Sequence, residues 1–130
     1  MKKIMLTATL MAMAFSGAAH AERKSKEEVL ADYERTGEFE YCIPLQSIDH
    51  SKVLDDQTIL FVMQGDRAYL NELPHKCPQL SFHESYMYKT SLNRLCNTDI
   101  ITVLDTAADM RLASCGLGKF EKLTEKEKAE

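Results

Sequence analysis

Residues 57–73, QTILFVMQGDRAYLNEL, decide the fold that we expect for this chain. Residues 58–64 are rich in β-branched and aromatic side chains, Gly65-Asp66 follows, and residues 67–73 continue with further apolar positions. Two such runs around a Gly-Asp pair predict a β-hairpin, because glycine readily adopts the positive φ that a type II′ turn needs at its first central position. We expect the other strands to pack on this hairpin.

Shorter patterns predict further strands on both sides of the hairpin. Pro44 favours an edge or bulged strand around it, because proline cannot donate a ladder hydrogen bond. Residues 49–57 are polar and are expected to form a loop with a turn at Asp55-Asp56. The remaining strand candidates are residues 41–48, the alternating aromatic segment 82–89, and residues 100–104, 110–115 and 119–123.

A short amphipathic helix is expected before the strands, within residues 22–35. Ser25 and Glu28 have capping-box spacing, and Gly37 is suited to end the helix. Six or seven short strands after one helix predict a mainly β fold: a small antiparallel barrel or sandwich with a short N-terminal helix.

The first residues predict export. Lys2 and Lys3 precede an apolar run, and Ala19-His20-Ala21 is a small-x-small cleavage site, so residues 1–21 are expected to form a signal peptide that is cleaved after Ala21. The apolar run is shorter than the roughly 20 residues that span a bilayer. We therefore expect a soluble periplasmic protein with no transmembrane segment after signal removal. Its single β domain would occupy residues 22–123, followed by a charged disordered tail at 124–130.

The charge balance disfavours a polyanionic partner. The whole chain has a formal net charge of −4, and removal of Lys2 and Lys3 makes the remainder more acidic. Nucleic-acid binding depends on basic side chains that neutralise phosphates, so we expect no nucleic-acid partner.

The chain has four cysteines, Cys42, Cys77, Cys96 and Cys115. An even number in a small exported chain without a C-x-x-C motif predicts two structural disulfides. We favour Cys77–Cys96, which would flank the strand at 82–89, together with Cys42–Cys115, which would tie the two ends of the domain. The pairings Cys42–Cys77 with Cys96–Cys115, and Cys42–Cys96 with Cys77–Cys115, remain open alternatives.

The cysteine frame and the residues around it resemble a family of small exported bacterial proteins that is known only as a domain of unknown function. Thr98 stands where the family pattern has glycine. The resemblance implies an envelope location and a four-cysteine fold, and it implies no activity. The residues that carry it are Cys42, Ile59-Leu60-Phe61, Tyr69-Leu70-Asn71, Leu73, Cys77-Pro78-Gln79-Leu80, Leu95-Cys96, Asp99 and Cys115-Gly116-Leu117-Gly118-Lys119-Phe120.

One short segment contains candidate metal ligands. His75, Cys77, His83 and Glu84 are all potential ligands of a transition metal. If Cys77 is oxidised, only His75, His83 and Glu84 remain, so we regard a metal site as the minor interpretation and expect no cofactor.

No motif for a catalytic nucleophile or a phosphate-binding loop is present in the sequence. We therefore expect a non-enzymatic binding or structural module of the cell envelope. Its partner would be an envelope protein, a peptide or a glycan, bound through a sheet edge or one end of the barrel, with strand addition as the physical route. The alternative is a small metal-binding or hydrolytic periplasmic protein that uses the segment from His75 to Glu84.

Overall fold

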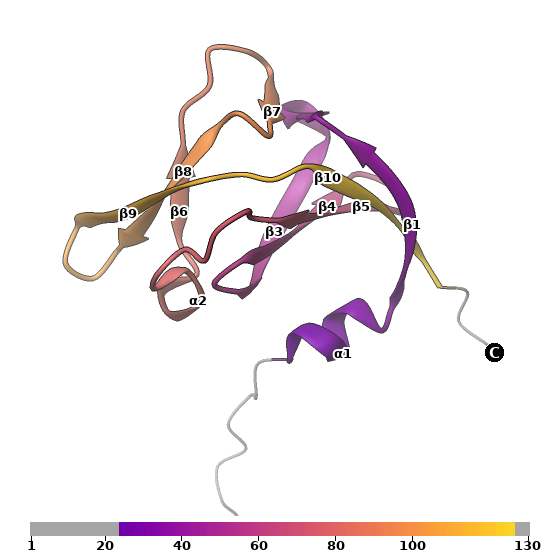
Figure 1. Cartoon of the computed structure of the whole chain (residues 1–130), viewed down its shortest axis with the longest axis horizontal. Helices are drawn as coiled ribbons and strands as arrows, with labels where there is room; N and C mark the ends of the chain where they lie inside the picture. Colours follow the sequence, from indigo (N-terminus) through magenta and orange to yellow (C-terminus); the bar gives the residue numbers. More distant parts are fainter. Residues whose placement is uncertain (1–23, 127–130) are drawn as a thin grey trace, which may run out of the picture.

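The computed structural model describes residues 24–126 (Figure 1). The expected signal peptide and its cleavage site at Ala21 lie outside the described residues, as do residues 127–130 of the expected tail. Within residues 24–126, no helix is long and apolar enough to cross a membrane.

The described chain consists of antiparallel strands with short helices between them. In chain order the elements are α1 (Lys26–Leu30), β1 (Tyr33–Glu40), β2 (Cys42–Pro44), the 3-10 helix η1 (Leu45–Ser47), β3 (Ile48–Asp55), β4 (Thr58–Met63), β5 (Arg67–Glu72), α2 (Leu80–His83), β6 (Tyr86–Tyr88), β7 (Arg94–Cys96), β8 (Ile100–Asp105), β9 (Met110–Gly116) and β10 (Phe120–Glu125).

The strands form three antiparallel sheets. A five-stranded sheet has the order β1-β10-β5-β4-β3, a three-stranded sheet has the order β6-β8-β9, and β2 pairs with β7. The mainly β fold is therefore confirmed. The barrel is not formed, because β1 and β3 are unjoined edges of the five-stranded sheet, and the sheets pack as a sandwich (Figure 1).

The hairpin of β4 and β5 lies at the centre of the five-stranded sheet, as expected, and both of its faces are buried. One face contributes to the main core, where the rings of Phe61 and Phe120 meet edge to face with centroids 5.5 Å apart. Gly65 has a φ of +84°, which confirms the expected positive φ. The prediction of a two-residue type II′ turn at Gly65-Asp66 is wrong. The last β4–β5 pair is Val62 with Ala68, and residues 63–67 lie between them.

The other face of the hairpin is covered by α1, which packs Val29 against a second cluster of buried side chains. The Ser25 hydroxyl accepts a hydrogen bond from the backbone N–H of Glu28 at 3.3 Å, which confirms the expected cap. The helix ends at Leu30, however, well before residue 35. The members of the second cluster are Val29, Leu60, Ala68, Leu70 and Leu123.

Residues 33–35, the end of the expected helix, belong instead to the edge strand β1, which runs to Glu40. Its sequence is polar, and its pairing with β10 is secured by side chains. Glu121 is only 5% exposed; it accepts a hydrogen bond from Arg35 Nε at 2.6 Å and another from the backbone N–H of Gly37 at 3.2 Å. Gly37 has a φ of +72° at the point where the β1 register shifts. A buried carboxylate on the neighbouring strand thus holds a bulged, polar strand in place.

Three further segments differ from the expectation. Residues 48–55 are the edge strand β3 and not a loop, although the chain does turn at Asp56-Gln57. The alternating segment 82–89 is divided between α2 and β6, and Glu84 between them has a φ of +54°. The last strand reaches Glu125, two residues beyond the expected end of the domain.

All four cysteines are in disulfides, but the favoured pairing is wrong. Cys42 pairs with Cys96 and Cys77 with Cys115, with Cα–Cα distances of 4.0 and 5.8 Å. Cys42 and Cys96 stand directly opposite each other in the β2–β7 pair. The favoured pairing assumed that Cys77 and Cys96 flank one strand, and that strand does not exist because α2 interrupts it.

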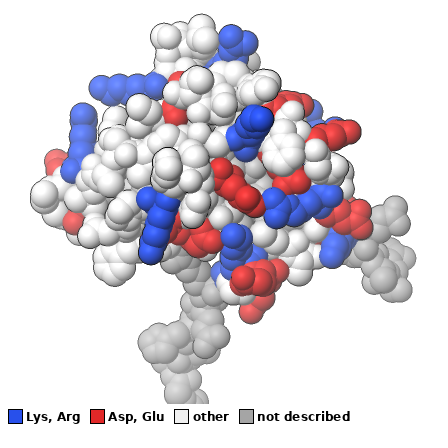
Figure 2. Space-filling model, viewed as in Figure 1, with Lys and Arg blue, Asp and Glu red and all other residues white. Residues whose placement is uncertain are grey.

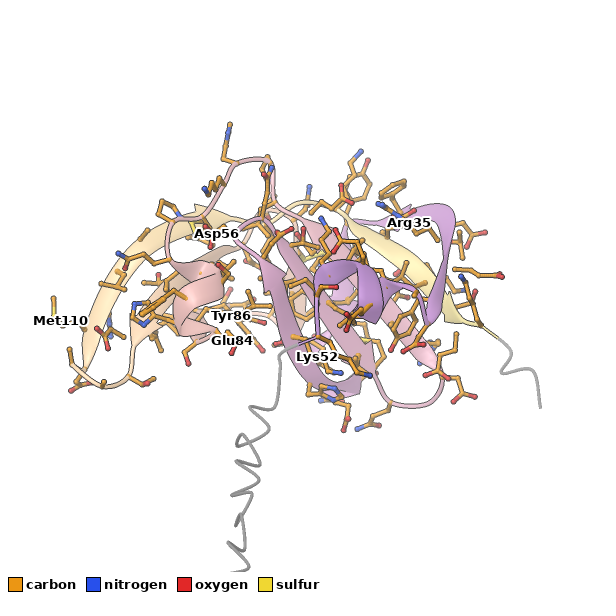
Figure 3. The ribbon with its side chains drawn as sticks, turned by 90° about the horizontal axis from the view of Figure 1, so that it is seen from below. Arg35, Lys52, Asp56, Glu84, Tyr86 and Met110 are labelled. Carbon is orange, nitrogen blue, oxygen red and sulfur yellow. A yellow bond between two sulfur atoms is a disulfide. The ribbon has the colours of Figure 1, made fainter. Side chains whose placement is uncertain are left out.

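The hydroxyl groups of Tyr86 and Ser51 lie 2.5 Å apart and join β6 of the three-stranded sheet to the β3 edge of the five-stranded sheet (Figure 3). Burial raises the pKa of Tyr86 to about 12; the Ser51 hydrogen bond opposes this rise and the nearby Tyr88 adds to it. The folded protein therefore binds the phenolic proton more tightly than the unfolded chain, whose tyrosine pKa is 10.0.

This raised pKa predicts alkaline destabilisation. The contribution of Tyr86 to stability is complete below pH 10.0 and is lost as the pH rises to about 12. The expected loss of unfolding free energy is about 2–3 kcal/mol, since one pKa unit corresponds to about 1.4 kcal/mol. Urea titrations across this pH range measure it, and Tyr86→Phe is the control that should show a shallower decline. Parallel declines in the two proteins would contradict the assignment.

Candidate functional site

The outer face of the three-stranded sheet is the surface most suited to binding. Along β8, Ile101 and Val103 are fully buried in the main core, so the residues that alternate with them face outward. Ile100 is 57% exposed, and the Thr102 hydroxyl lies 2.9 Å from that of Ser114 on β9. One face of this sheet therefore supports the fold, and the other is left open.

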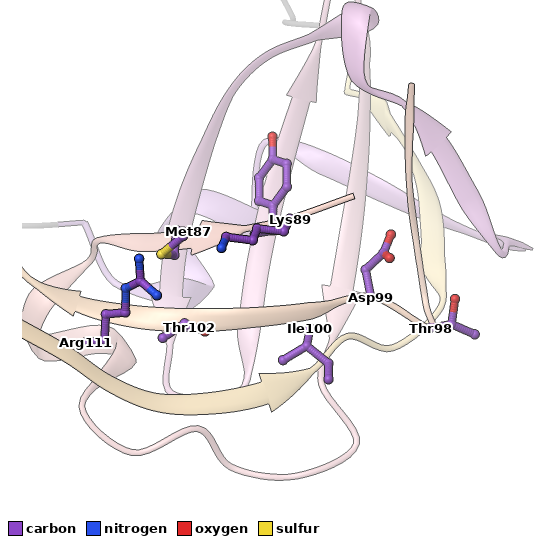
Figure 4. A pocket seen from close by; sticks show the side chains of 8 residues that line it. Met87, Lys89, Thr98, Asp99, Ile100, Thr102 and Arg111 are labelled. Atoms are coloured by element: carbon purple, nitrogen blue, oxygen red, sulfur yellow. The ribbon is translucent and has the colours of Figure 1, made fainter. Parts of the chain in front are cut away.

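A pocket of about 380 Å³ opens on this outer face (Figure 4). We call it the outer-face pocket. Its apolar lining comes from Met87 and Tyr88 on β6 and from Ile100 on β8. Thr98 and Thr102 add hydroxyl groups beside them. Apolar contact area is thus combined with a few polar groups, as is typical of ligand sites.

Three charged side chains line the outer-face pocket: Lys89, Asp99 and Arg111. Figure 4 shows the charged ends of Lys89 and Arg111 directed toward Met87, with Asp99 farther along near Thr98. Within residues 24–126, neither of the two cations has an ion-pair partner.

Asp99 has a structural role inside the pocket. Its carboxylate accepts a hydrogen bond from the backbone N–H of Cys96 at 2.7 Å, and its backbone carbonyl accepts one from Leu117 at 3.1 Å. One oxygen of the Asp99 carboxylate is therefore already hydrogen-bonded. Lys89 and Arg111 give the opposite end of the pocket a positive charge.

A larger depression, of about 480 Å³, lies where α1 meets the β3–β4 turn, and its charges are already paired. Lys26 Nζ contacts Asp55 and Thr58, both at 3.1 Å, and Glu72 binds Arg35 at 2.6 Å. Burial by itself would raise the pKa of Asp55, but the backbone N–H of Gln57 and the Lys26 and Thr58 side chains hold that pKa below its ordinary value. These contacts make the depression part of the folded framework.

The candidate metal ligands do not converge. Cys77 is fully buried in its disulfide with Cys115 and has no free thiolate. His83 packs its ring edge to face with Phe82, with centroids 4.9 Å apart, and His75 lies in the loop after β5. In the described part of the chain, no group of three or more His, Cys, Asp or Glu side chains is placed to hold a metal ion.

The sheet edges are poorly suited to strand addition. The register shifts within each of the long edge strands or their pairings: β1 between Arg35 and Phe39, β3 at two points, and β9 opposite residues 102–104. The other edge strands, β2, β6 and β7, have three residues each. Bulges and short length both discourage pairing with another chain, so the outer face is a better binding surface than any edge.

Comparison with known proteins places the chain in a family. The sequence model described as "Family of unknown function (DUF6491)" matches residues 1–130. The chain belongs to this family. No curated protein and no solved structure matches the chain.

In this member of DUF6491, the motif residues noted in the sequence have structural roles. Asn71 donates from Nδ2 to the Gly118 carbonyl at 2.7 Å and accepts at Oδ1 from the Gly118 N–H at 2.8 Å. The two disulfides and the buried parts of β4, β5 and β10 account for most of the others. Thr98 does not have a positive φ, so its turn needs no glycine. Of the motif residues only Asp99 lines the outer-face pocket.

Sequence reasoning missed the outer-face pocket. Sequence alternation places Met87 and Lys89 opposite the aromatic face of segment 82–89. The predicted strand at 100–104 has no face assigned to Ile100, and no binding role is predicted for Lys89 or Arg111. Alternation along IITVL does place Ile100 on the face of the polar Thr102 and Ile101 on the face of Val103, but this single polar residue does not show that other elements complete a pocket on that face. Finding the pocket requires knowing that β6 and β9 lie on either side of β8 and bring Met87, Lys89 and Arg111 to this face.

Proposed function

We propose that the protein is a non-enzymatic binding module of the cell envelope and that its ligand site is the outer-face pocket. The observation that carries this proposal is that two cations, Lys89 and Arg111, share a pocket with an exposed apolar side chain, Ile100, and have no ion-pair partner within residues 24–126. Charged side chains in the larger depression already have ion-pair partners: Lys26 binds Asp55, and Glu72 binds Arg35 outside the depression. A charged side chain without an ion-pair partner can gain more binding free energy from a ligand than one that is already paired, and exposed apolar surface adds contact area.

A binding role agrees better with the pocket than catalysis does. No histidine lines the pocket, and its one carboxylate, on Asp99, is already bonded to a backbone N–H. A general base for nucleophilic or hydrolytic chemistry needs an accessible acceptor near its target proton. The pocket offers hydroxyl groups, cations and apolar surface, which are groups that bind and orient a ligand.

The proposed location is the periplasm, reached through cleavage of a signal peptide after Ala21. One disulfide joins β2 to β7, the other joins the loop after β5 to β9, and such bonds persist in oxidising compartments. Fractionation of cells that express the full chain, with mass spectrometry of its N-terminus, tests both points. A cytoplasmic product that begins at Met1 would contradict this location.

Site-specific photo-crosslinking in cells tests the binding site. A photoreactive phenylalanine at Ile100 is expected to form an adduct, whereas the same group at Phe39 is not. The two positions are equally exposed, at 57%, and Phe39 lies on β1 in the other sheet. Equal adducts at the two positions, or none at Ile100, would show that the outer-face pocket is not the binding site.

A further inference from the structure

Building on the proposed function, we infer that the outer-face pocket binds an acidic segment of a partner protein. Carboxylates of the segment pair with Lys89 and Arg111, and an adjacent apolar side chain rests on Met87 and Ile100. Four observations on the pocket carry this inference: its charge, the geometry of its cations, its apolar lining and its openness.

The first observation is the local sign of charge. The whole chain is acidic, with a formal net charge of −4, and basic and acidic side chains are interspersed on the face shown in Figure 2. The pocket has the opposite balance, because two cations and one carboxylate line it, and neither cation has an ion-pair partner among the described residues. A local positive charge selects a compact anionic group, whereas the net negative charge disfavours a long polyanion such as nucleic acid.

The second observation is the type and direction of the two cations. Figure 4 shows the Arg111 guanidinium and the Lys89 ammonium both directed toward Met87. A guanidinium can bind a carboxylate through two parallel hydrogen bonds, and an ammonium acts as a mobile point charge beside it. Together they suit one or two carboxylates held above the sheet.

The third observation is the apolar part of the pocket lining. Met87 and Ile100 both line the pocket, and Ile100 is more than half exposed. A methionine side chain adapts its shape to different apolar partners. The ligand therefore needs an apolar group next to its carboxylates, as Asp or Glu beside Leu or Val provides.

The fourth observation is that the pocket lies open on a sheet face. Sites for small molecules usually enclose most of the ligand surface. The outer-face pocket instead opens along the surface of β6 and β8, so a ligand that reaches beyond it is accommodated. This geometry suits a peptide segment better than a free amphipathic acid.

Methionine NMR tests the inference directly. Residues 24–126 contain three methionines: Met87 lines the pocket, Met63 is buried in the core, and Met110 is exposed on the β8–β9 hairpin, next to Arg111 in sequence and so on the opposite side of β9. The protein purified after export is labelled at its methionine methyl groups. The probe is a synthetic peptide of Asp and Leu in equal numbers, and the matched control peptide has Lys in place of Asp.

The acidic peptide is expected to shift the Met87 methyl signal saturably and to leave those of Met63 and Met110 in place. The basic peptide should shift none of them. Raising the ionic strength from about 0.01 to about 0.15 M should weaken the interaction, since the Debye length falls from about 30 to about 8 Å. Equal shifts from both peptides, or a larger shift at Met110 than at Met87, would overturn the inference.

A double variant tests the two cations. Lys89→Glu with Arg111→Glu should weaken acidic-peptide binding at least tenfold and allow the basic peptide to bind. Both side chains are exposed and unpaired in the described chain, and an unchanged Met63 signal shows that the core is intact. Lys89→Gln with Arg111→Gln provides a milder variant if the reversal disturbs folding. Unaltered affinity in a folded variant would exclude the two cations from the site.

The same NMR experiment distinguishes two other possible occupants of the outer-face pocket. Decanoate is an amphipathic acid without a peptide chain, and a Met87 shift at the same concentration as the peptide would overturn the assignment to a protein segment. A Met87 shift that depends on protein concentration without any peptide would mean that a second copy of the chain occupies the site. A further outcome is a photo-crosslink at Ile100 in cells together with an acidic peptide that leaves the Met87 methyl signal unchanged. That result would support the proposed binding site and contradict the acidic class of ligand.

Discussion

Replacing Gly118 with alanine is expected to destabilise the fold by at least about 3 kcal/mol. A Cβ at this position would lie 2.0 Å from the backbone carbonyl oxygen of Glu72. Backbone atoms of β5 have little room to move, because β5 is bonded to strands on both sides. Any shift would also disturb the two hydrogen bonds between Gly118 and Asn71, each worth about 1 kcal/mol. Urea unfolding monitored by circular dichroism measures the change.

Gly116→Ala is the matched control for this substitution. Gly116 lies in the same short motif, and a Cβ there would meet no atom within 4 Å. Neither glycine has a positive φ, so the comparison isolates the steric clash from backbone preference. Gly116→Ala should change the unfolding free energy by less than about 1 kcal/mol. Similar stabilities of the two variants would mean that the β9–β10 connection does not approach β5 as closely as described.

Removing the Cys77–Cys115 disulfide is expected to cost about 4 kcal/mol from chain entropy alone, given its sequence separation of 38. Cys77 is also fully buried within the main core, so Cys77→Ala with Cys115→Ala leaves a gap among packed side chains. The loss should therefore exceed the entropic value. Thermal and urea unfolding of the double variant measure it.

Cys42→Ala with Cys96→Ala is the control for the entropic contribution. This disulfide has the larger sequence separation, 54, so chain entropy alone would make its removal the more costly of the two. Both of its cysteines are only half-buried, at the side of the β2–β7 pair. We expect the larger loss of stability from removal of the Cys77–Cys115 disulfide, because the loss of Cys77 packing outweighs the small difference in chain entropy. A greater loss from the Cys42–Cys96 pair would contradict this role for Cys77.

The apolar hairpins could be predicted from the sequence because their side chains form the core. Residues 58–73 and 100–115 carry enough apolar side chains to be recognised, and β4, β5, β8 and β9 occupy these segments. The number of disulfides followed from the even cysteine count and the predicted export. The family resemblance was confirmed over the whole chain.

The polar edge strands could not be predicted from apolar periodicity. β1 and β3 have mostly exposed side chains, and β1 depends on contacts with residues more than 80 positions away, such as that of Arg35 with Glu121. The disulfide pairing failed for a related reason. It depends on which strands are neighbours in space, and the decisive pairing of β2 with β7 joins two three-residue segments with little local signal.

The alternation along β8 has a consequence for how this family can diversify. Ile101 and Val103 maintain the fold, whereas Ile100 and Thr102 line the pocket without contributing to the core. Because successive side chains of a strand point to opposite faces, substitutions at the second pair change the pocket lining and leave the core side chains in place. Under the proposed binding role, ligand preference could therefore change while the scaffold stays the same, and the same separation makes this face a suitable starting point for engineering new recognition.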